Sequence, residues 1–356
     1  MRSRLVVPVV ALLVGLLVGL LVGLQGLAAP AYAEEPVPRP VLNVDFPDPA
    51  VVATPHGLVG YSTGDLVPHA WSRNDNGRWQ REPGVLAERP SWSREGGIWA
   101  ADVARIRGRW LLYYAAPVRG MGEHGRCIGV ARASSARGPF RPVGRSPLAC
   151  PSYADAPLAK DPLLPRDPSL PRAGVIDPSV FVDSAGAAHL LYKTDRLPST
   201  IRMVALTRSG QAVRSGEVSR ELVRSEGVVE NPVLVEQPEG FVLIVSEGDW
   251  TRCTYRTLWL RTTDLLNWTA PETGVLLDSD TSRLCGPGGA DLVEVPGRPR
   301  MRLFLHGWTC HSTDLPCAGR AKWDHRDRAR GVRAMYAAVL GWSGGLPQVE
   351  GWLEPR

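Results

Sequence analysis

Residues 48–63 read DPAVVATPHGLVGYST: an Asp-Pro pair, a short apolar strand, a turn with Gly, and a second, stronger apolar strand. Asp-Pro cannot extend a strand ladder, so by itself the pair marks only a turn before a strand. Similar units return four more times. They read AADVARIRGRWLLYYA at 100–115, DPSVFVDSAGAAHLLYKT at 177–194, ENPVLVEQPEGFVLIVSEG at 230–248 and GADLVEVPGRPRMRLFLHGW at 289–308.

The spacing of these units decides between β architectures. They begin 52, 77, 53 and 59 residues apart, and a third apolar strand follows most of them, as in CIGVARAS at 127–134. Short strands with turn signals, repeated every 50–60 residues, are typical of a β-propeller, and helical periodicity is almost absent after residue 33. The sequence therefore predicts an all-β, five-bladed β-propeller, with the Pro-rich segment 151–172 as an irregular loop. A sandwich or a pair of β-domains explains the strands but not five alignable units.

The N-terminus has the features of an export signal. Arg2 and Arg4 precede an apolar run from Leu5 to Leu27, and the sequence AAPAYA follows. A basic start, an apolar middle and an Ala-x-Ala end are typical of a signal peptide, although the run is also long enough for a membrane anchor. The small residues at its end favour cleavage after Ala33. We expect residues 1–33 to be the signal peptide, residues 34–356 to be one secreted catalytic domain, and no stable membrane association after cleavage.

Charge and cysteine content limit the partners. The formal net charge is +5, and acids and bases are interspersed without a run of one sign, whereas nucleic-acid binders concentrate basic residues on one stripe. We therefore expect no nucleic-acid partner, and a monomer. Six cysteines in an exported chain should form disulfides. Proximity favours the pairs Cys127–Cys150, Cys253–Cys285 and Cys310–Cys317, and no Cys-x-x-Cys pair suggests structural zinc.

One position of the repeat carries the chemistry. The first strand of each propeller blade lines the central channel, so the residues that begin the five units meet at one mouth. We call these the lead positions; by this alignment they are Asp48, Ala100, Asp177, Glu230 and Gly289. Any one acid there could cap a turn, but buried like charges are costly unless they are used.

Three carboxylates around one pocket suit glycoside hydrolysis. One carboxylate takes a proton from water, a second protonates the leaving oxygen, and a third keeps the pKa of the second high by like-charge repulsion. The chemistry thus calls for the number and type of acids that the lead positions supply.

Five motifs in this order resemble glycoside hydrolase family 43, the five-bladed furanosidases, arabinanases and xylosidases. They are DFPDPAVV, IWAADV, GVIDPSVFVD, EGVVENPVLV and CGPGGADLV, and the resemblance extends from about residue 43 to the end. It implies that Asp48 is the general base, Asp177 the acid that modulates a pKa, and Glu230 the general acid. Asn231 stands where the family pattern usually has Gly, and WAADV replaces the more usual Trp-Ala-Pro-Asp-Val.

The resemblance implies two further roles. Arg333, nine residues before Trp342, would contact substrate or an acid. His306, in LFLHGW, matches a histidine found at a channel metal in arabinanase-like members. No cofactor is required, but a largely water-coordinated Ca²⁺ in the central channel is an expectation. The alternative for a lone inner-strand histidine is a hydrogen-bonded core residue.

Tryptophans are candidate sugar platforms. Trp99 lies beside the lead position Ala100 and is the first candidate for stacking on a sugar face; Trp92, Trp250 and Trp308 are further candidates. We expect a secreted, inverting glycoside hydrolase with a carbohydrate substrate, an arabinose- or xylose-containing plant polysaccharide (arabinan, xylan) or its oligomers. It would be of α-L-arabinofuranosidase, endo-arabinanase or β-xylosidase type. The alternatives are a sugar-binding propeller without catalysis and a propeller related to fructan hydrolases.

Overall fold

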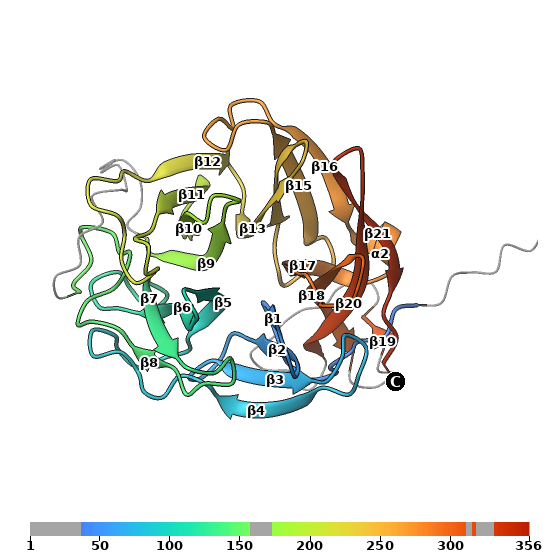
Figure 1. Ribbon diagram of the computed structural model, residues 1–356, viewed down its shortest axis with the longest axis horizontal. Helices are drawn as coiled ribbons and strands as arrows, with labels where there is room; N and C mark the ends of the chain where they lie inside the picture. Colours follow the sequence, from blue (N-terminus) through green and yellow to red (C-terminus); the bar gives the residue numbers. More distant parts are fainter. Residues whose placement is uncertain (1–36, 157–172, 311–314, 318–330, 356) are drawn as a thin grey trace, which may run out of the picture. The chain divides into compact units, whose positions relative to one another are not determined.

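Five antiparallel sheets stand around a central axis in the computed structural model (Figure 1), which confirms the predicted all-β propeller. The structure describes residues 37–156, 173–310, 315–317 and 331–355, and Val37–Arg356 form one compact unit. The predicted signal peptide and residues 157–172 of the predicted loop lie outside the described residues. None of the described helices is long and apolar enough to cross a membrane.

Each blade is built from one continuous segment of four strands in sequence order. Blade one contains β1 (Ala50–Thr54), β2 (Gly57–Tyr61), β3 (Pro68–Ser72) and β4 (Gln80–Gly84), and blade two β5 (Trp99–Ile106), β6 (Arg109–Pro117), β7 (Arg126–Ala133) and β8 (Arg141–Pro142). Blade three contains β9 (Val175–Val182), β10 (Ala188–Thr194), β11 (Ser199–Ala205) and β12 (Arg220–Ser225). Blade four contains β13 (Val229–Gln237), β14 (Gly240–Glu247), β15 (Arg256–Thr262) and β16 (Glu272–Leu277). Blade five, after the short helix α2 (Ser279–Ser282), contains β17 (Cys285–Val293), β18 (Met301–Cys310), β20 (Val332–Ser343) and β21 (Leu346–Trp352), with β19 (Leu315–Pro316) paired to β18.

The apolar second strand of every unit has a simple cause. In a strand, successive side chains point to opposite faces, and each blade is packed on both faces. In β14, Val242 and Ile244 join the core between blades four and five, whereas Leu243 and Val245 join the core between blades three and four. Five such cores separate the five blades. A sheet buried on both sides needs a nearly continuous apolar run.

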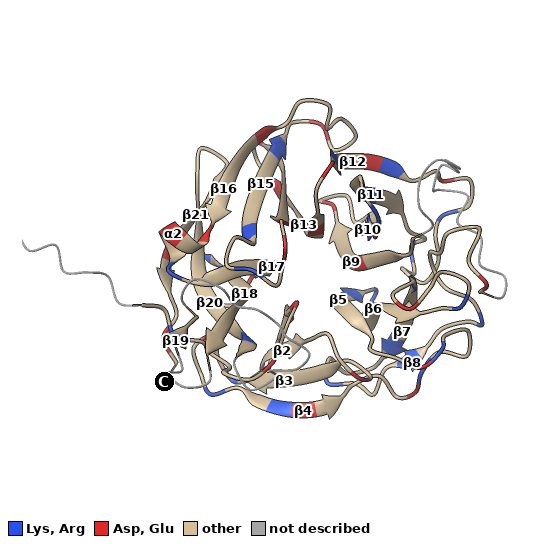
Figure 2. Ribbon diagram, turned by 180° about the vertical axis from the view of Figure 1, so that it is seen from behind, with Lys and Arg blue, Asp and Glu red and all other residues tan. Residues whose placement is uncertain are grey.

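The ring of blades is closed without a blade that combines strands from the two ends of the chain. The inner strands contact one another in the order β1, β5, β9, β13, β17 and back to β1. The N-terminal segment adds a clasp, because Leu42 and Met335 of β20 exchange backbone hydrogen bonds of 3.2 and 3.0 Å. Charges are mixed on the outer strands: β4 and β12 each carry both signs (Figure 2).

The three predicted disulfides are present. Cys127–Cys150, Cys253–Cys285 and Cys310–Cys317 have Cα–Cα distances of 4.7, 4.2 and 5.1 Å. The first links β7 to the segment that runs beside it, and the second links the β14–β15 connection of blade four to the first strand of blade five. Two of the bridges thus lie where long connections leave the blades.

Candidate active site

Four of the five lead positions share an unusual backbone conformation, and the same conformation in blade four corrects the sequence alignment there. Asp48, Ala100, Asp177 and Gly289 have φ of 51°, 39°, 53° and 58°. In blade four the residue with this conformation is Asn231, with φ of 49°, and not Glu230. Only Gly, and to a smaller extent Asn and Asp, adopts this region easily. The alignment was therefore wrong by one residue, because the pair that matches Asp-Pro is Asn231-Pro232.

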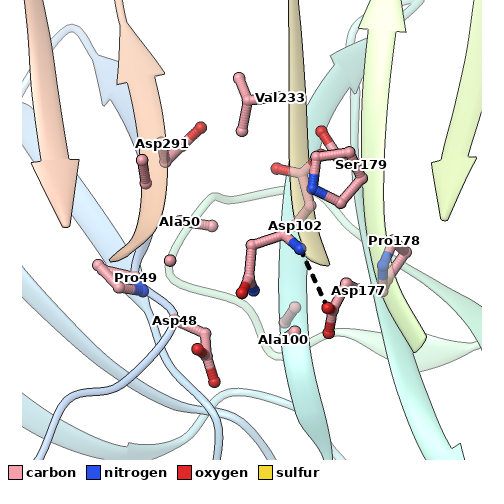
Figure 3. A pocket seen from close by; sticks show the side chains of 15 residues that line it. Asp48, Pro49, Ala50, Ala100, Asp102, Asp177, Pro178, Ser179, Val233 and Asp291 are labelled. Carbon is pink, nitrogen blue, oxygen red and sulfur yellow. Dashed lines mark hydrogen bonds between the residues drawn. The ribbon is translucent and has the colours of Figure 1, made fainter. Parts of the chain in front are cut away.

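This backbone turn places the lead side chains at one pocket. The register of the inner hairpins shifts at the turn in blades two, three, four and five, and such bulges re-aim side chains beside active sites. The pocket is lined from all five inner strands and includes Asp48, Ala100, Asp177, Asn231 and Gly289 (Figure 3). The predicted convergence of the five blades is thus observed, with Asn231 in place of Glu230 at the lining.

Asp48 is held as an accessible carboxylate. Thr63 Oγ1 donates to Asp48 Oδ2 at 2.7 Å, and Thr63 in turn accepts the Ala100 amide proton at 2.8 Å. Arg333 Nη1 lies 3.8 Å from Asp48 Oδ1. The Asp48 side chain keeps 17 % of its surface exposed. An ionised carboxylate with free lone pairs at a pocket can accept a proton from water.

Asp177 is a carboxyl group of this site whose protonated form is favoured by burial. Its residue is 6 % exposed, and its Oδ2 accepts the Asn231 amide proton at 3.1 Å, the dashed line of Figure 3. Desolvation raises its pKa well above the ordinary range, and the negative charges of Glu230 and Asp48 raise it further. Burial and the two neighbouring carboxylates therefore favour the protonated form of Asp177.

Glu230 lies one residue before the turn and is bound by two donors. Lys193 Nζ of β10 donates to Glu230 Oε2 at 2.7 Å, and the Tyr255 hydroxyl donates to Glu230 Oε1 at 2.7 Å. Burial alone would lower the pKa of Lys193, but the charges of Glu230, Asp177 and Asp195 outweigh it and raise that pKa. Lys193 thus stays charged. The resting site thus places a cation against Glu230, next to the Asp177 carboxyl group.

His306 faces the lead position of blade one and not a cluster of metal ligands. The Asp48 amide donates to His306 Nδ1 at 3.1 Å, and desolvation lowers the pKa of His306 to about 3. The imidazole is therefore neutral with its proton on Nε2, which is buried and without a hydrogen-bond partner. A nitrogen that carries a proton cannot ligate a cation, and the described residues contain no group of three His, Cys, Asp or Glu suited to a metal. These residues do not fit a directly ligated Ca²⁺.

The aromatic candidates differ in exposure. Trp92 is 6 % exposed within the core between blades one and two, and Trp308 is 3 % exposed, with its indole nitrogen donating to the Trp250 carbonyl. Trp250 is partly exposed, stacks on Trp308, and lies 4.5 Å below the Arg333 guanidinium. Trp99 is also partly exposed. Of the four candidates for sugar stacking, Trp99 and Trp250 are thus the two that are partly exposed.

The sequence reasoning missed a second pair of carboxylates in the channel. Asp102 and Asp291 each lie two residues after a lead position, and both line the pocket (Figure 3). Asp291 Oδ2 accepts the amide proton of Val51, and Asp102 Oδ2 that of Val180, each at 2.6 Å. Asp291 thus fixes the inner strand that follows Asp48, and Asp102 the one that follows Asp177, in each case at the backbone three residues after the lead position. The similar tripeptides Ala-Ala-Asp at 100–102 and Gly-Ala-Asp at 289–291 were the sequence signal that could have revealed this pair.

Desolvation gives these two channel carboxylates high pKa values. It raises the pKa of Asp102 to about 6, and desolvation together with the charge of Asp102 raises that of Asp291 to about 8. Lys193 and Tyr255 were missed for a different reason: a lone polar residue in or directly before an apolar strand is normally a packing detail. Only the fold brings them to Glu230.

The site as a whole contains one group that can accept a proton and one that can donate a proton. Asp48, an accessible carboxylate held by Thr63, lines the pocket together with Asp177, whose protonated form burial and the charge of Glu230 favour. Two acidic groups whose environments separate their protonation states are the arrangement that acid–base hydrolysis requires.

The fold is shared with solved glycoside hydrolase structures. A thermostable family-43 glycoside hydrolase has a TM-score of 0.65 and 16 % identity, covering 90 % of this chain and 97 % of that one. An endo-1,4-β-xylanase from Bacteroides thetaiotaomicron has a TM-score of 0.64 and 18 % identity, and the match covers 88 % of this chain and 97 % of the xylanase. The α-L-arabinanase from Cellvibrio cellulosa has a TM-score of 0.66 and 18 % identity, and the match covers 88 % of this chain and 99 % of the arabinanase. A comparison with curated protein sequences found no match.

The sequence itself also matches a family profile, over residues 37–325, which include all five lead positions and Glu230. That match covers most of the chain. The protein therefore belongs to glycosyl hydrolases family 43.

Proposed function

We propose that this protein is a secreted, inverting glycoside hydrolase that acts on arabinose- or xylose-containing plant polysaccharides or their oligomers. The observation that carries the proposal is one pocket lined by an accessible carboxylate, Asp48, and by Asp177, a carboxyl group whose pKa burial and the charge of Glu230 raise. Family membership supports the reaction class. Solved structures of the same fold include an arabinanase complexed with arabinohexaose and a xylan β-1,4-xylosidase, which support the substrate class. Three disulfides are in keeping with an oxidising, extracellular location.

In the proposed mechanism, Asp48 accepts a proton from the attacking water while Glu230 protonates the leaving oxygen. Thr63 and Arg333 hold Asp48 in position. Asp177 and Glu230 repel each other when both are ionised, so this pair favours keeping one proton, and Glu230 donates that proton to the leaving oxygen. Substrate binding has to move the Lys193 ammonium off Glu230, because an acid bonded to a cation holds its proton poorly.

The experiment follows the anomeric configuration of the first product. Aryl arabinofuranoside, aryl xyloside and debranched arabinan are each incubated with the enzyme, and proton NMR records the product before mutarotation. Inversion of the anomeric centre on at least one substrate is the expected result. Retention would contradict the assignment of Asp48 as a base, because a retaining enzyme uses that carboxylate as a nucleophile. The Asp48→Asn variant is the control for contaminating activity.

A further inference from the structure

An unpaired guanidinium lies beside the mouth of blade two. Arg126, the first residue of β7, is 4 % exposed, and no described carboxylate is within ion-pair distance of it. Among the described residues, its two terminal nitrogens donate only to the carbonyls of His124 and Gly97, at 2.8 and 3.3 Å. Its Nε is buried and has no hydrogen-bond partner in the same described part of the chain. Burying a charge without a counter-ion is costly unless something else binds it.

A second guanidinium increases the positive potential at this place. Arg94 also donates only to backbone carbonyls, those of Val118, Glu95, Gly122 and Glu123. It lies close enough to repel Arg126: desolvation, and then the charge of Arg94, lower the pKa of Arg126 to about 9. Two arginines that repel each other and lack carboxylate partners form a site for an anion.

Two short series of contacts connect Arg126 to the catalytic carboxylates. The guanidinium carbon lies 3.0 Å from the ring centre of Trp99, whose neighbour Ala100 is bonded through Thr63 to Asp48. On the other side, the charge of Asp195 acts on Arg126, and Asp195 lies 3.4 Å from Lys193 Nζ, which binds Glu230. Arg126 is thus adjacent to both the base side and the acid side of the pocket.

We propose that Arg126, with Arg94 and the ring of Trp99, forms a subsite for a sugar that carries a carboxylate, that is, a uronic acid residue of the substrate. This inference rests on the proposed function, because it adds the charge of the substrate to that activity. A planar carboxylate matches the fork of a guanidinium, and the sugar ring that carries it can contact the exposed part of Trp99. The same negative charge attracts Lys193, which favours its release from Glu230.

The first test is binding to the intact enzyme, with methyl β-D-glucuronide and methyl β-D-glucoside as a pair that differs only at C6. Tighter binding of the glucuronide by about tenfold or more is expected by calorimetry, since a charge-assisted hydrogen bond has about this effect. Arg126→Gln should abolish the difference, and Arg126→Lys should recover part of it. Arg105→Gln is the matched control, because Arg105 also lies over a tryptophan of blade two, Trp110, and is not among the residues that line the pocket of Asp48. Equal binding of the two glycosides by the wild-type enzyme would overturn the proposal.

The second test separates this proposal from the proposed function. Xylo-oligosaccharides with and without a glucuronosyl branch are compared by kcat/KM. Faster hydrolysis of the acidic substrate, lost in Arg126→Gln and kept in Arg105→Gln, supports the subsite; equal rates on both contradict it. Hydrolysis of neither would count against the proposed function, while the binding comparison would still decide the subsite. If Arg126→Gln does not fold, as judged by circular dichroism, the more exposed Arg94→Gln takes its place.

Discussion

Lys193 Nζ lies 2.7 Å from Glu230 Oε2, so a buried cation from blade three binds the proposed general acid of blade four. The ammonium opposes the protonation of the acid pair, whose other member, Asp177, has a pKa that desolvation and neighbouring carboxylates raise and Lys193 lowers. The resting enzyme thus keeps its acid bonded to a cation, and the strength of that bond should control the alkaline limit of activity.

Replacing Lys193 should therefore move the alkaline limb of the pH profile. In Lys193→Met the cation is lost, the pair Asp177 and Glu230 retains its proton to higher pH, and the alkaline limb of kcat/KM should rise by about one pH unit or more. Arg202→Met is the control, since it removes a buried cation of the same blade that pairs with Glu221. An alkaline limb that stays in place or moves to lower pH would mean that Lys193 does not act on the acid.

The roles of Asp48 and Glu230 can be separated by leaving groups. A good leaving group departs without protonation, so Glu230→Ala should lose little activity on a dinitrophenyl glycoside, and about 10²-fold or more on an unactivated oligosaccharide. Asp48→Ala should lose activity on both, because water must be activated whatever departs. Initial rates on the two substrates provide the measurement. The reverse pattern would exchange the two assignments.

Stability should fall as the pH rises through the pKa values of the channel carboxylates. Asp102 and Asp291 have folded-state pKa values of about 6 and about 8, above the value near 4 of an unfolded chain. Their contribution is fully present below about pH 4 and is lost as pH rises through 6 and 8. The melting temperature should therefore decrease between pH 5 and 9, and Asp291→Asn should flatten the upper part of that decrease. A melting temperature that rises over this range would contradict the assignment.

Chelation should leave activity unchanged. The Asp48 amide proton occupies His306 Nδ1, so His306 Nε2 carries a proton and cannot ligate a cation. Initial rates measured after dialysis against EDTA, and again after adding Ca²⁺, should agree within error. Activity that is lost with EDTA and restored by Ca²⁺ would contradict this expectation. It would show that the imidazole ring of His306 flips and that the channel holds a Ca²⁺ ion.

The three disulfides should differ in their effect on stability. Their sequence separations are 32 residues for Cys253–Cys285, 23 for Cys127–Cys150 and 7 for Cys310–Cys317. On the chain-entropy account the Cys127→Ser/Cys150→Ser variant should lose about 3 kcal/mol, and the shortest loop should lose the least. Urea unfolding of the three double-serine variants measures the order. A larger loss for the Cys310–Cys317 pair would point to native-state strain or packing instead of loop closure.

The sequence by itself determined the blades. Each blade is one continuous segment, and its second strand is apolar on both faces because cores lie on both sides, so a period of about 50–60 residues was sufficient to predict five of them. The disulfide pairs followed from proximity in the chain. Asp48 and Asp177 followed from their recurring Asp-Pro context, since the left-handed residue before the strand is a local property of the backbone.

The tertiary structure alone decided the environment of the acids. Glu230 was aligned one position out of register, because sequence shows which residue is acidic but not which has a positive φ; that residue is Asn231. Lys193 and Arg126 come from second and third strands and Tyr255 directly precedes a third strand, and nothing local distinguishes them from packing residues. Their charge matters only through distances across blades, and Coulomb energy and desolvation depend on those distances and not on position in the chain.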